Sequence, residues 1–180
     1  YACGMATYSS EMLQNARSVN SDCEILVTRK SFPFAKRFTI RALLSGGVMP
    51  HRLGLSESVL IFGHHRALYA DERAFEAALP GIKKRCVEKK LVVESEDLED
   101  AKKMLDLGAD VIQMDKSTPE ILSALVAYKQ EHHPHATIIA AGGINRKNVV
   151  QYAQTGVDAI VTSSLYQAGM ADLTTIWKGV

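Results

Sequence analysis

Short apolar runs alternate with longer amphipathic stretches along almost the whole sequence, and few folds accommodate such an alternation. The apolar runs are rich in valine, isoleucine and leucine, and they cover residues 24–28, 58–62, 90–93, 110–114, 137–141 and 158–162. Runs of this length and composition are typical of strands that are buried on both faces, as in a parallel sheet covered by helices. They therefore predict parallel strands in an α/β fold.

The stretches between these runs predict the helices that cover the sheet. Apolar residues recur in them at helical spacing, over residues 10–19, 38–45, 71–89, 97–107, 119–131 and 147–155. Two of the helices end at a glycine, Gly108 or Gly156, which is followed by one apolar residue, an aspartate and the next strand. This repetition indicates successive βα units, and 180 residues suit a single α/β domain.

A series of βα units in this length fits either an open doubly wound sheet or most of a (β/α) barrel. In barrels, the chemistry is concentrated at the C-terminal ends of the strands. A polar or glycine-rich motif follows every predicted strand here: Arg29-Lys30, Gly63-His64-His65, Glu94, Asp115-Lys116, Gly142-Gly143 and Ser163-Ser164. We therefore expect an incomplete TIM-like (β/α) barrel.

The charge balance excludes two classes of partner. Lysine and arginine number 21, and aspartate and glutamate number 20, which leaves a net charge of +1. A protein that gathers nucleic acid or anionic lipid over its whole surface is usually more basic. No apolar run approaches the roughly 18 residues of a membrane span, and the first residues lack the pattern of a signal peptide. We expect a cytoplasmic protein that binds neither nucleic acid nor membrane.

The charged residues at the predicted strand ends are sorted by sign. Arg29, Lys30 and Arg52, with His51, follow the first strand and precede the second, and cations of this kind suit an anionic substrate. Two carboxylates, Glu94 and Asp115, end the next two strands, where they suit a divalent ion such as Mg²⁺. The Gly142-Gly143 pair allows backbone N–H groups to approach a phosphate. Together the motifs predict a site for a phosphorylated, metal-bound substrate beside a second anionic one.

Each motif alone also has an ordinary structural explanation. A carboxylate at a strand end, such as Glu94, is often a helix cap or the partner of a neighbouring lysine. Arg29-Lys30 is equally compatible with a solvated surface pair, and Gly142-Gly143 with a tight turn. These explanations weaken because every predicted strand ends in such a motif.

The order and spacing of the motifs resemble those of the quinolinate phosphoribosyltransferase family, also called nicotinate-nucleotide pyrophosphorylases. The resemblance covers essentially the whole chain. The matching motifs are Thr28-Arg29-Lys30, the stretch from Gly46 to Leu55 with His51-Arg52, Val59-Leu60-Ile61, Glu94, the stretch from Gly108 to Asp115, Gly142-Gly143-Ile144 and the stretch from Tyr152 to Asp158. Within the family, Pro50 before His51 and the sequence Phe62-Gly63-His64-His65 resemble the ModD-type pyrophosphorylases associated with molybdate transport.

The resemblance implies a domain organisation and an assembly. In the family an N-terminal α/β domain precedes an incomplete α/β barrel, and dimers place the N-terminal domain of one subunit over the barrel of the other. We accordingly expect residues 1–22 to be the tail of such a domain or a linking helix, and residues 23–180 to be the barrel of a larger subunit. A homodimer or higher homo-oligomer is expected.

The resemblance also implies the roles of the site residues. The activity would be phosphoribosyl transfer from phosphoribosyl pyrophosphate to a quinolinate-like pyridine carboxylate, with release of pyrophosphate and with Mg²⁺ as cofactor. The implied residues, in order of role, are Arg29, Lys30, His51 and Arg52 for the pyridine carboxylate, Lys30, Glu94 and Asp115 for catalysis, Glu94 and Asp115 for the metal, and Gly142, Gly143, Ser163 and Ser164 for phosphate.

Two departures from the family pattern leave other functions open. Phe62 stands where the family has a substrate-contacting lysine, and Ser163 replaces a glycine of the last phosphate loop. These changes put quinolinate itself and the decarboxylation step in doubt. They favour a non-catalytic protein that binds phosphate or another anion and is linked to molybdate transport. The site residues that are retained argue against this alternative: Arg29, Lys30, His51, Arg52, Glu94 and Asp115. Another phosphate-binding barrel enzyme, similar to thiamine-phosphate synthase, is a weaker alternative because it does not explain the motifs at Arg29-Lys30 and His51-Arg52.

Overall fold

Seven parallel strands form one curved sheet in the computed structural model, which describes residues 1–178. Their order across the sheet is β2-β1-β7-β6-β5-β4-β3. The strands are β1 (Glu24–Val27), β2 (Met49–Pro50), β3 (Val59–Ile61), β4 (Leu91–Ser95), β5 (Val111–Asp115), β6 (Thr137–Ala141) and β7 (Ala159–Thr162). Strands β2 and β3 follow one another in the chain and would be neighbours in a closed barrel, but here they form the two edges of the sheet. The fold is therefore the predicted incomplete TIM-like barrel.

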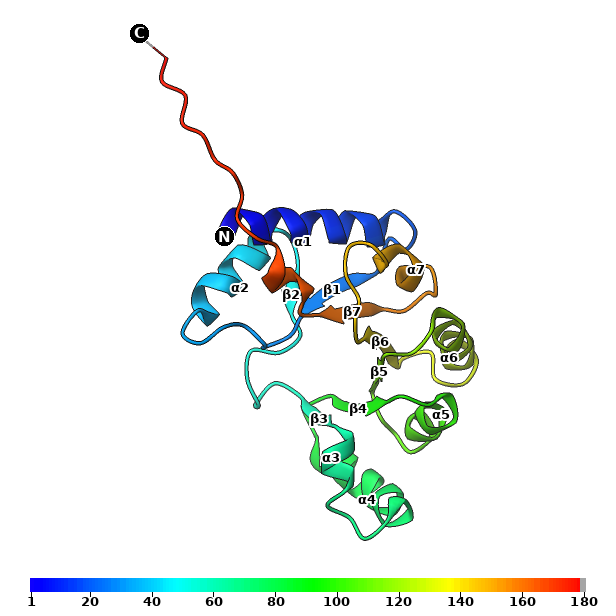
Figure 1. Cartoon of the computed structure of the whole chain (residues 1–180). Helices are drawn as coiled ribbons and strands as arrows, with labels where there is room; N and C mark the ends of the chain where they lie inside the picture. Colours follow the sequence, from blue (N-terminus) through cyan, green and yellow to red (C-terminus); the bar gives the residue numbers. More distant parts are fainter. Residues whose placement is uncertain (179–180) are drawn as a thin grey trace.

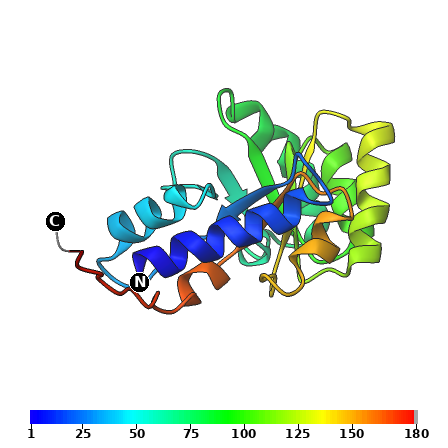
Figure 2. The same cartoon turned by 90° about the horizontal axis from the view of Figure 1, so that it is seen from above.

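The helices lie along the outside of the arc that the strands make (Figure 1). They are α1 (Ala2–Arg17), α2 (Lys36–Ser45), α3 (Gly63–Arg66), α4 (Glu72–Arg85), α5 (Leu98–Asp106), α6 (Pro119–His132), α7 (Val149–Ala153) and the short 3-10 helix η1 (Ser164–Gln167). Seen from above, α1 runs along the molecule beside α2 and η1 (Figure 2). None of the helices within residues 1–178 has the length and apolarity that crossing a membrane requires.

The predicted strands and main helices are all present, and the differences are confined to short elements and ends. The first helix begins at Ala2 rather than Ser10, because Met5 and Ser9 continue the buried face made by Met12 and Ala16. The helix expected at 147–155 is shortened to α7. Strand β2, helix α3 and η1 were not predicted, since elements of two to four residues show no hydrophobic period.

Two layers of apolar side chains form the core. The larger layer lies between the sheet and its helices and includes fully buried residues such as Phe75 and Met104. The smaller layer lies on the other face of the strands, inside the arc, and consists of Leu60, Val92, Val111, Ile139, Ala141, Ala159 and Val161. Alternate residues of each strand point to opposite faces of a sheet. The inner layer therefore provides an apolar floor beneath the C-terminal ends of the strands.

The three cysteines are free thiols. Cys3 is exposed, Cys86 is partly exposed and Cys23 is buried. Burial raises the pKa of the Cys23 thiol to about 11, and the nearby Glu24 carboxylate adds to this effect. A thiol with so high a pKa is protonated and unreactive at neutral pH.

Candidate functional site

A cavity of about 900 Å³ lies at the C-terminal ends of the strands, above the inner apolar layer. All the residues predicted for the site line it, although they come from the C-terminal ends of six different strands: Arg29, Lys30, His51, Arg52, Glu94, Asp115, Gly142, Gly143, Ser163 and Ser164. Leu60, Ala141 and Val161 of the inner layer form part of the lining. The parallel topology thus brings together residues that are far apart in the sequence.

One side of the cavity is cationic. Arg29 and Lys30 follow β1, and Arg52 follows the neighbouring strand β2; none of these three side chains forms an ion pair within residues 1–178. Burial lowers the pKa of His51, and the charges of Arg52 and Arg29 lower it further. Burial and Arg29 likewise lower the pKa of Arg52. Uncompensated cations that repel one another are stabilised by a bound anion.

The opposite side of the cavity carries oxygen donors. Glu94 on β4 lies in register with Gln113 on β5, and the Gln113 amide donates a hydrogen bond of 2.8 Å to Glu94 Oε2. Asp115 ends the same strand as Gln113, and its Oδ2 lies 3.6 Å from Lys116 Nζ. Burial raises the pKa of Glu94; the Gln113 hydrogen bond opposes this effect, and the charge of Asp115 adds to it.

Gln113 is a site residue that the sequence reasoning missed. Its side chain is 6% exposed, and its Oε1 oxygen has no hydrogen-bond partner among the described residues. The available signal was a single amide within the otherwise apolar run Val111-Ile112-Gln113-Met114. A buried acceptor without a partner is costly unless a ligand or water satisfies it.

The donor set on this side fits a hard cation shared with a substrate. Magnesium prefers oxygen ligands and is commonly held by one or two carboxylates together with substrate phosphates. Glu94 and Asp115 are two such carboxylates. No group of three or more histidine, cysteine, aspartate or glutamate side chains within residues 1–178 is placed to hold a metal ion without further ligands.

Two consecutive glycines after β6 connect the two sides of the cavity. Gly142 and Gly143 have φ angles of +86° and +71°, which glycine adopts without strain. A Cβ atom on Gly142 would lie 2.6 Å from the Lys116 backbone nitrogen and 2.7 Å from Asp115 Oδ1. The close approach of this loop to Asp115 therefore requires glycine at position 142.

Two cations that follow the glycine loop in the chain were also missed by the sequence reasoning. Arg146 and Lys147 line the cavity and follow Gly142-Gly143 after Ile144 and Asn145. The Arg146 guanidinium lies 5.0 Å from the centre of the Tyr8 ring and 3.2 Å from Glu11 Oε2, so α1 positions it. The sequence signal was the basic pair that follows the glycines. These cations extend the anion-binding side of the cavity toward β6.

The serines after β7 are held by the strand itself. Thr162 Oγ1 donates to the Ile144 carbonyl at 2.6 Å and accepts from the Ser164 backbone N–H at 3.0 Å. The Tyr166 hydroxyl donates to the Thr28 carbonyl at 2.6 Å, which joins η1 to β1. The loop thus has a fixed course between the glycine pair and the cations of β1.

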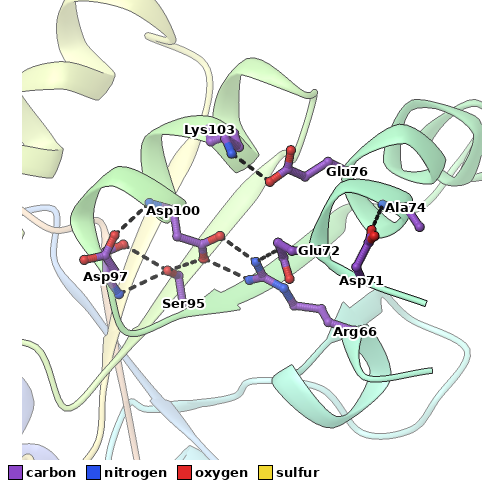
Figure 3. A network of polar contacts seen from close by, with 9 residues as sticks. All are labelled: Arg66, Asp71, Glu72, Ala74, Glu76, Ser95, Asp97, Asp100 and Lys103. Atoms are coloured by element: carbon purple, nitrogen blue, oxygen red, sulfur yellow. Dashed lines mark hydrogen bonds and ion pairs between the residues drawn. The ribbon is translucent and has the colours of Figure 1, made fainter. Parts of the chain in front are cut away.

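A network of hydrogen bonds and ion pairs joins α3, α4 and α5 to the end of β4 (Figure 3). Arg66, the last residue of α3, donates two hydrogen bonds to Asp100, of 2.9 and 2.5 Å, and a third to Glu72. Ser95 Oγ donates to the same Asp100 carboxylate at 2.6 Å. The Arg66 side chain is 13% exposed and lies over the Phe75 ring. Arg66 therefore ties α3 to the strand end that carries Glu94.

Replacing Arg66 with alanine is expected to lower the free energy of unfolding by about 2 kcal/mol, because Asp100 is left partly buried without its charged partner. Burial alone would raise the pKa of Asp100, but the hydrogen bonds from Arg66 and Ser95 outweigh it and lower the pKa. This stabilisation is present above the unfolded pKa of about 4 and is lost as pH falls through the folded pKa. Urea unfolding at pH 7 and pH 3 measures both effects.

The exposed pair Lys103–Glu76, drawn in the same figure, provides the control. Lys103→Ala removes one positive charge near the network but leaves Arg66 and Asp100 paired, and exposed ion pairs contribute little to stability. Equal stabilities for Arg66→Ala and Lys103→Ala at pH 7 would contradict the structural role given to Arg66.

Comparison with known proteins relates this arrangement to one family. The sequence model described as "Quinolinate phosphoribosyl transferase, C-terminal domain" matches residues 5–174. A ModD protein of Pasteurella multocida (strain Pm70) is 34% identical over 176 residues, which are 98% of this chain and 62% of that protein. A protein named for carboxylating nicotinate-nucleotide pyrophosphorylase activity in Methanothermobacter thermautotrophicus is 32% identical over 160 residues, 87% of this chain and 56% of that protein.

Solved structures show the same fold. The nicotinate-nucleotide pyrophosphorylase of Ehrlichia chaffeensis superposes with a TM-score of 0.80 at 21% identity, over 93% of this chain and 58% of the other. That of Francisella tularensis gives a TM-score of 0.79 at 25% identity, over 92% and 56% of the two chains. This chain thus spans less than two thirds of the length of the relatives it matches.

Proposed function

This chain belongs to the quinolinate phosphoribosyltransferase family, and on that premise we propose that the protein is a phosphoribosyltransferase acting on phosphoribosyl pyrophosphate and a pyridine carboxylate. One observation carries the proposal. The cavity divides, in the order of the strands, into the uncompensated cations after β2 and β1, the glycine loop after β6, and the carboxylates of β5 and β4. Such a division suits two anionic substrates, one of which brings its own cation.

The cationic side binds the acceptor in this proposal. Arg29 and Arg52 donate charge-assisted hydrogen bonds to a carboxylate and hold the heteroaromatic ring in one orientation. His51 is neutral at pH 7 because its pKa is lowered, so it acts as a hydrogen-bonding group rather than as a further charge. Lys30 follows β1 and lines the same cavity, and in this proposal it contacts both substrates. A fixed ring directs its nitrogen lone pair at one carbon of the donor.

The other side binds the donor substrate. Gly142 and Gly143 allow the backbone to approach the 5′-phosphate, with Ser163, Ser164 and Lys147 beside them. Glu94 and Asp115 would hold Mg²⁺, which when bound neutralises charge on a pyrophosphate leaving group. The two carboxylates also stabilise the positive charge that develops on the ribosyl ring as the bond to pyrophosphate breaks. Cytoplasmic location and the homo-oligomer implied by the family stay predictions.

A non-catalytic anion-binding protein linked to molybdate transport is the second candidate, and the aromatic Phe62 in the cavity lining favours it. It uses the same cations but requires no chemistry from Glu94 and Asp115. The two candidates therefore differ in turnover and not in whether phosphorylated ligands bind.

Replacing Arg52 with alanine is expected to weaken binding of a pyridine carboxylate by about 10- to 100-fold, because one charge-assisted contact is removed. The affinity for phosphoribosyl pyrophosphate is expected to change much less, since Arg52 lies on the acceptor side of the cavity. Titration calorimetry of the whole protein with nicotinate, quinolinate and phosphoribosyl pyrophosphate measures these affinities.

Arg41→Ala is the matched control, because Arg41 is an exposed arginine of α2 that does not line the cavity. If Arg52→Ala and Arg41→Ala bind pyridine carboxylates as tightly as the unaltered protein, the acceptor site proposed at Arg29 and Arg52 is wrong.

A further inference from the structure

Phe62 forms the wall of the cavity at its β3 edge. It directly follows β3, lines the cavity and packs against the inner apolar layer. Its ring stacks on His64, with ring centres 5.4 Å apart and an angle of 14° between the planes, and it lies 5.7 Å from the ring centre of His65. Of these three residues only Phe62 lines the cavity, and Phe62 together with the two histidines packed against it is called the aromatic wall.

The aromatic wall is held in place by contacts on both sides of Phe62. The Phe62 backbone N–H donates to His65 Nδ1 at 3.0 Å, which closes the first turn of α3. A helix of four residues has little stability of its own. The ion pairs of Arg66 with Asp100 and Glu72 stabilise α3, because they tie its end to α5 and α4 (Figure 3). The Phe62 ring is therefore a fixed part of the site.

The aromatic wall offers no positive charge to a ligand. Among the described residues, the cations that line the cavity follow β1, β2, β5 and β6, and none follows β3 or β4. Arg66, the nearest cation along the chain, is bound to two carboxylates and lines a second cavity, which shares only Glu94 with the first. Burial, together with His64 and Arg52, lowers the pKa of His65, so its imidazole is neutral at pH 7.

A carboxylate directed at the aromatic wall would therefore be poorly compensated. It would face the Phe62 ring, with the Glu94 carboxylate on the adjacent strand β4. An unpaired charge that loses its water shell is costly. An aromatic ring edge at the same place is favoured, because it packs against Phe62.

Resting on the proposed function, we propose that the aromatic wall selects a heteroaromatic acceptor whose carboxylate lies on one side of the ring only. The carboxylate meets Arg29 and Arg52, and an edge of the ring that carries no carboxylate packs against Phe62. The ring nitrogen lone pair forms the new bond to C1 of the ribose, and the C1–oxygen bond breaks with its electron pair leaving on pyrophosphate. No carbon–carbon bond is cleaved, so the nucleotide keeps its carboxylate and no carbon dioxide forms.

The test compares nicotinate, which has one carboxylate, with quinolinate, which has two on adjacent carbons. We expect the unaltered protein to bind nicotinate at least about 10-fold more tightly than quinolinate, and Phe62→Lys to shift this ratio toward quinolinate by about 10-fold or more. Leu68→Lys adds the same charge at an exposed position outside the cavity and is expected to leave the ratio unchanged. Phe62→Met keeps the wall apolar and should preserve the preference for nicotinate.

Either of two results with the unaltered protein would overturn the inference: tighter binding of quinolinate than of nicotinate, or release of carbon dioxide from quinolinate in step with pyrophosphate. A ratio that Phe62→Lys leaves unchanged, with the variant folded by circular dichroism, would also overturn it. Failure of the proposed function would give a different result, because no pyrophosphate would then be released with either acid. The dissociation constants of nicotinate and quinolinate would still test the aromatic wall.

Discussion

Replacing Asp115 with asparagine is expected to lower kcat for pyrophosphate release by about 10²- to 10³-fold, the usual effect of removing one electrostatic contact to a transition state. Asparagine has the same shape, so β5 and the glycine loop keep their packing. What is lost is the negative charge that would hold magnesium and stabilise the ribosyl cation. Steady-state release of pyrophosphate, followed with a coupled phosphate assay, measures the change.

Glu94→Gln is expected to have an effect of similar size, because the Gln113 amide can still donate to the new side-chain oxygen while the charge is removed. Asp106→Asn is the control: it makes the same change at an exposed carboxylate at the far end of α5, which is bound to Tyr128 and His133. A kcat unaltered in Asp115→Asn and Glu94→Gln would exclude these carboxylates from the reaction.

Replacing Gly142 with alanine is expected to lower the free energy of unfolding by about 3 kcal/mol, from strain at positive φ together with overpacking. The new Cβ would meet the Lys116 backbone nitrogen, which cannot move without shifting the end of β5, and Asp115 Oδ1, which would have to turn away. Activity is expected to fall as well, since Asp115 is displaced. Urea unfolding followed by circular dichroism gives the change in stability.

Gly143→Ala separates strain from overpacking. Gly143 also has a positive φ, but a Cβ there has no neighbouring atom within 4 Å. We expect a loss of about 1 kcal/mol from backbone strain alone. Equal losses for Gly142→Ala and Gly143→Ala would mean that the approach of Gly142 to Asp115 has no energetic consequence.

The sequence was sufficient for the barrel because each of its main strands is a continuous apolar run with a turn signal on either side. Strand β2 could not be predicted in this way, since two residues show no period and its pairing with β1 depends on tertiary contacts. Helix α3 is similar: its four residues are held by Arg66, whose partner Asp100 lies 34 residues further along the chain.

Within the site, the motifs after the strands identified the residues that the structure brings together. Three site residues were not predicted, because none of them forms a motif with the strand end that it follows or belongs to: Gln113, Arg146 and Lys147. Gln113 gains significance only from its register with Glu94, and Arg146 from its contacts with α1. The roles of the site residues, the metal and the acceptor stay predictions, since they depend on chemistry that the fold permits but does not by itself specify.

The most direct test of the proposed function is to supply the whole protein with phosphoribosyl pyrophosphate, Mg²⁺ and nicotinate or quinolinate, and to quantify pyrophosphate and nucleotide in the same samples. We predict one pyrophosphate per nucleotide formed, only when both the acid and Mg²⁺ are present, and neither product with Asp115→Asn. Saturable binding of phosphoribosyl pyrophosphate without release of pyrophosphate would contradict the proposal and identify the protein as an anion-binding protein instead.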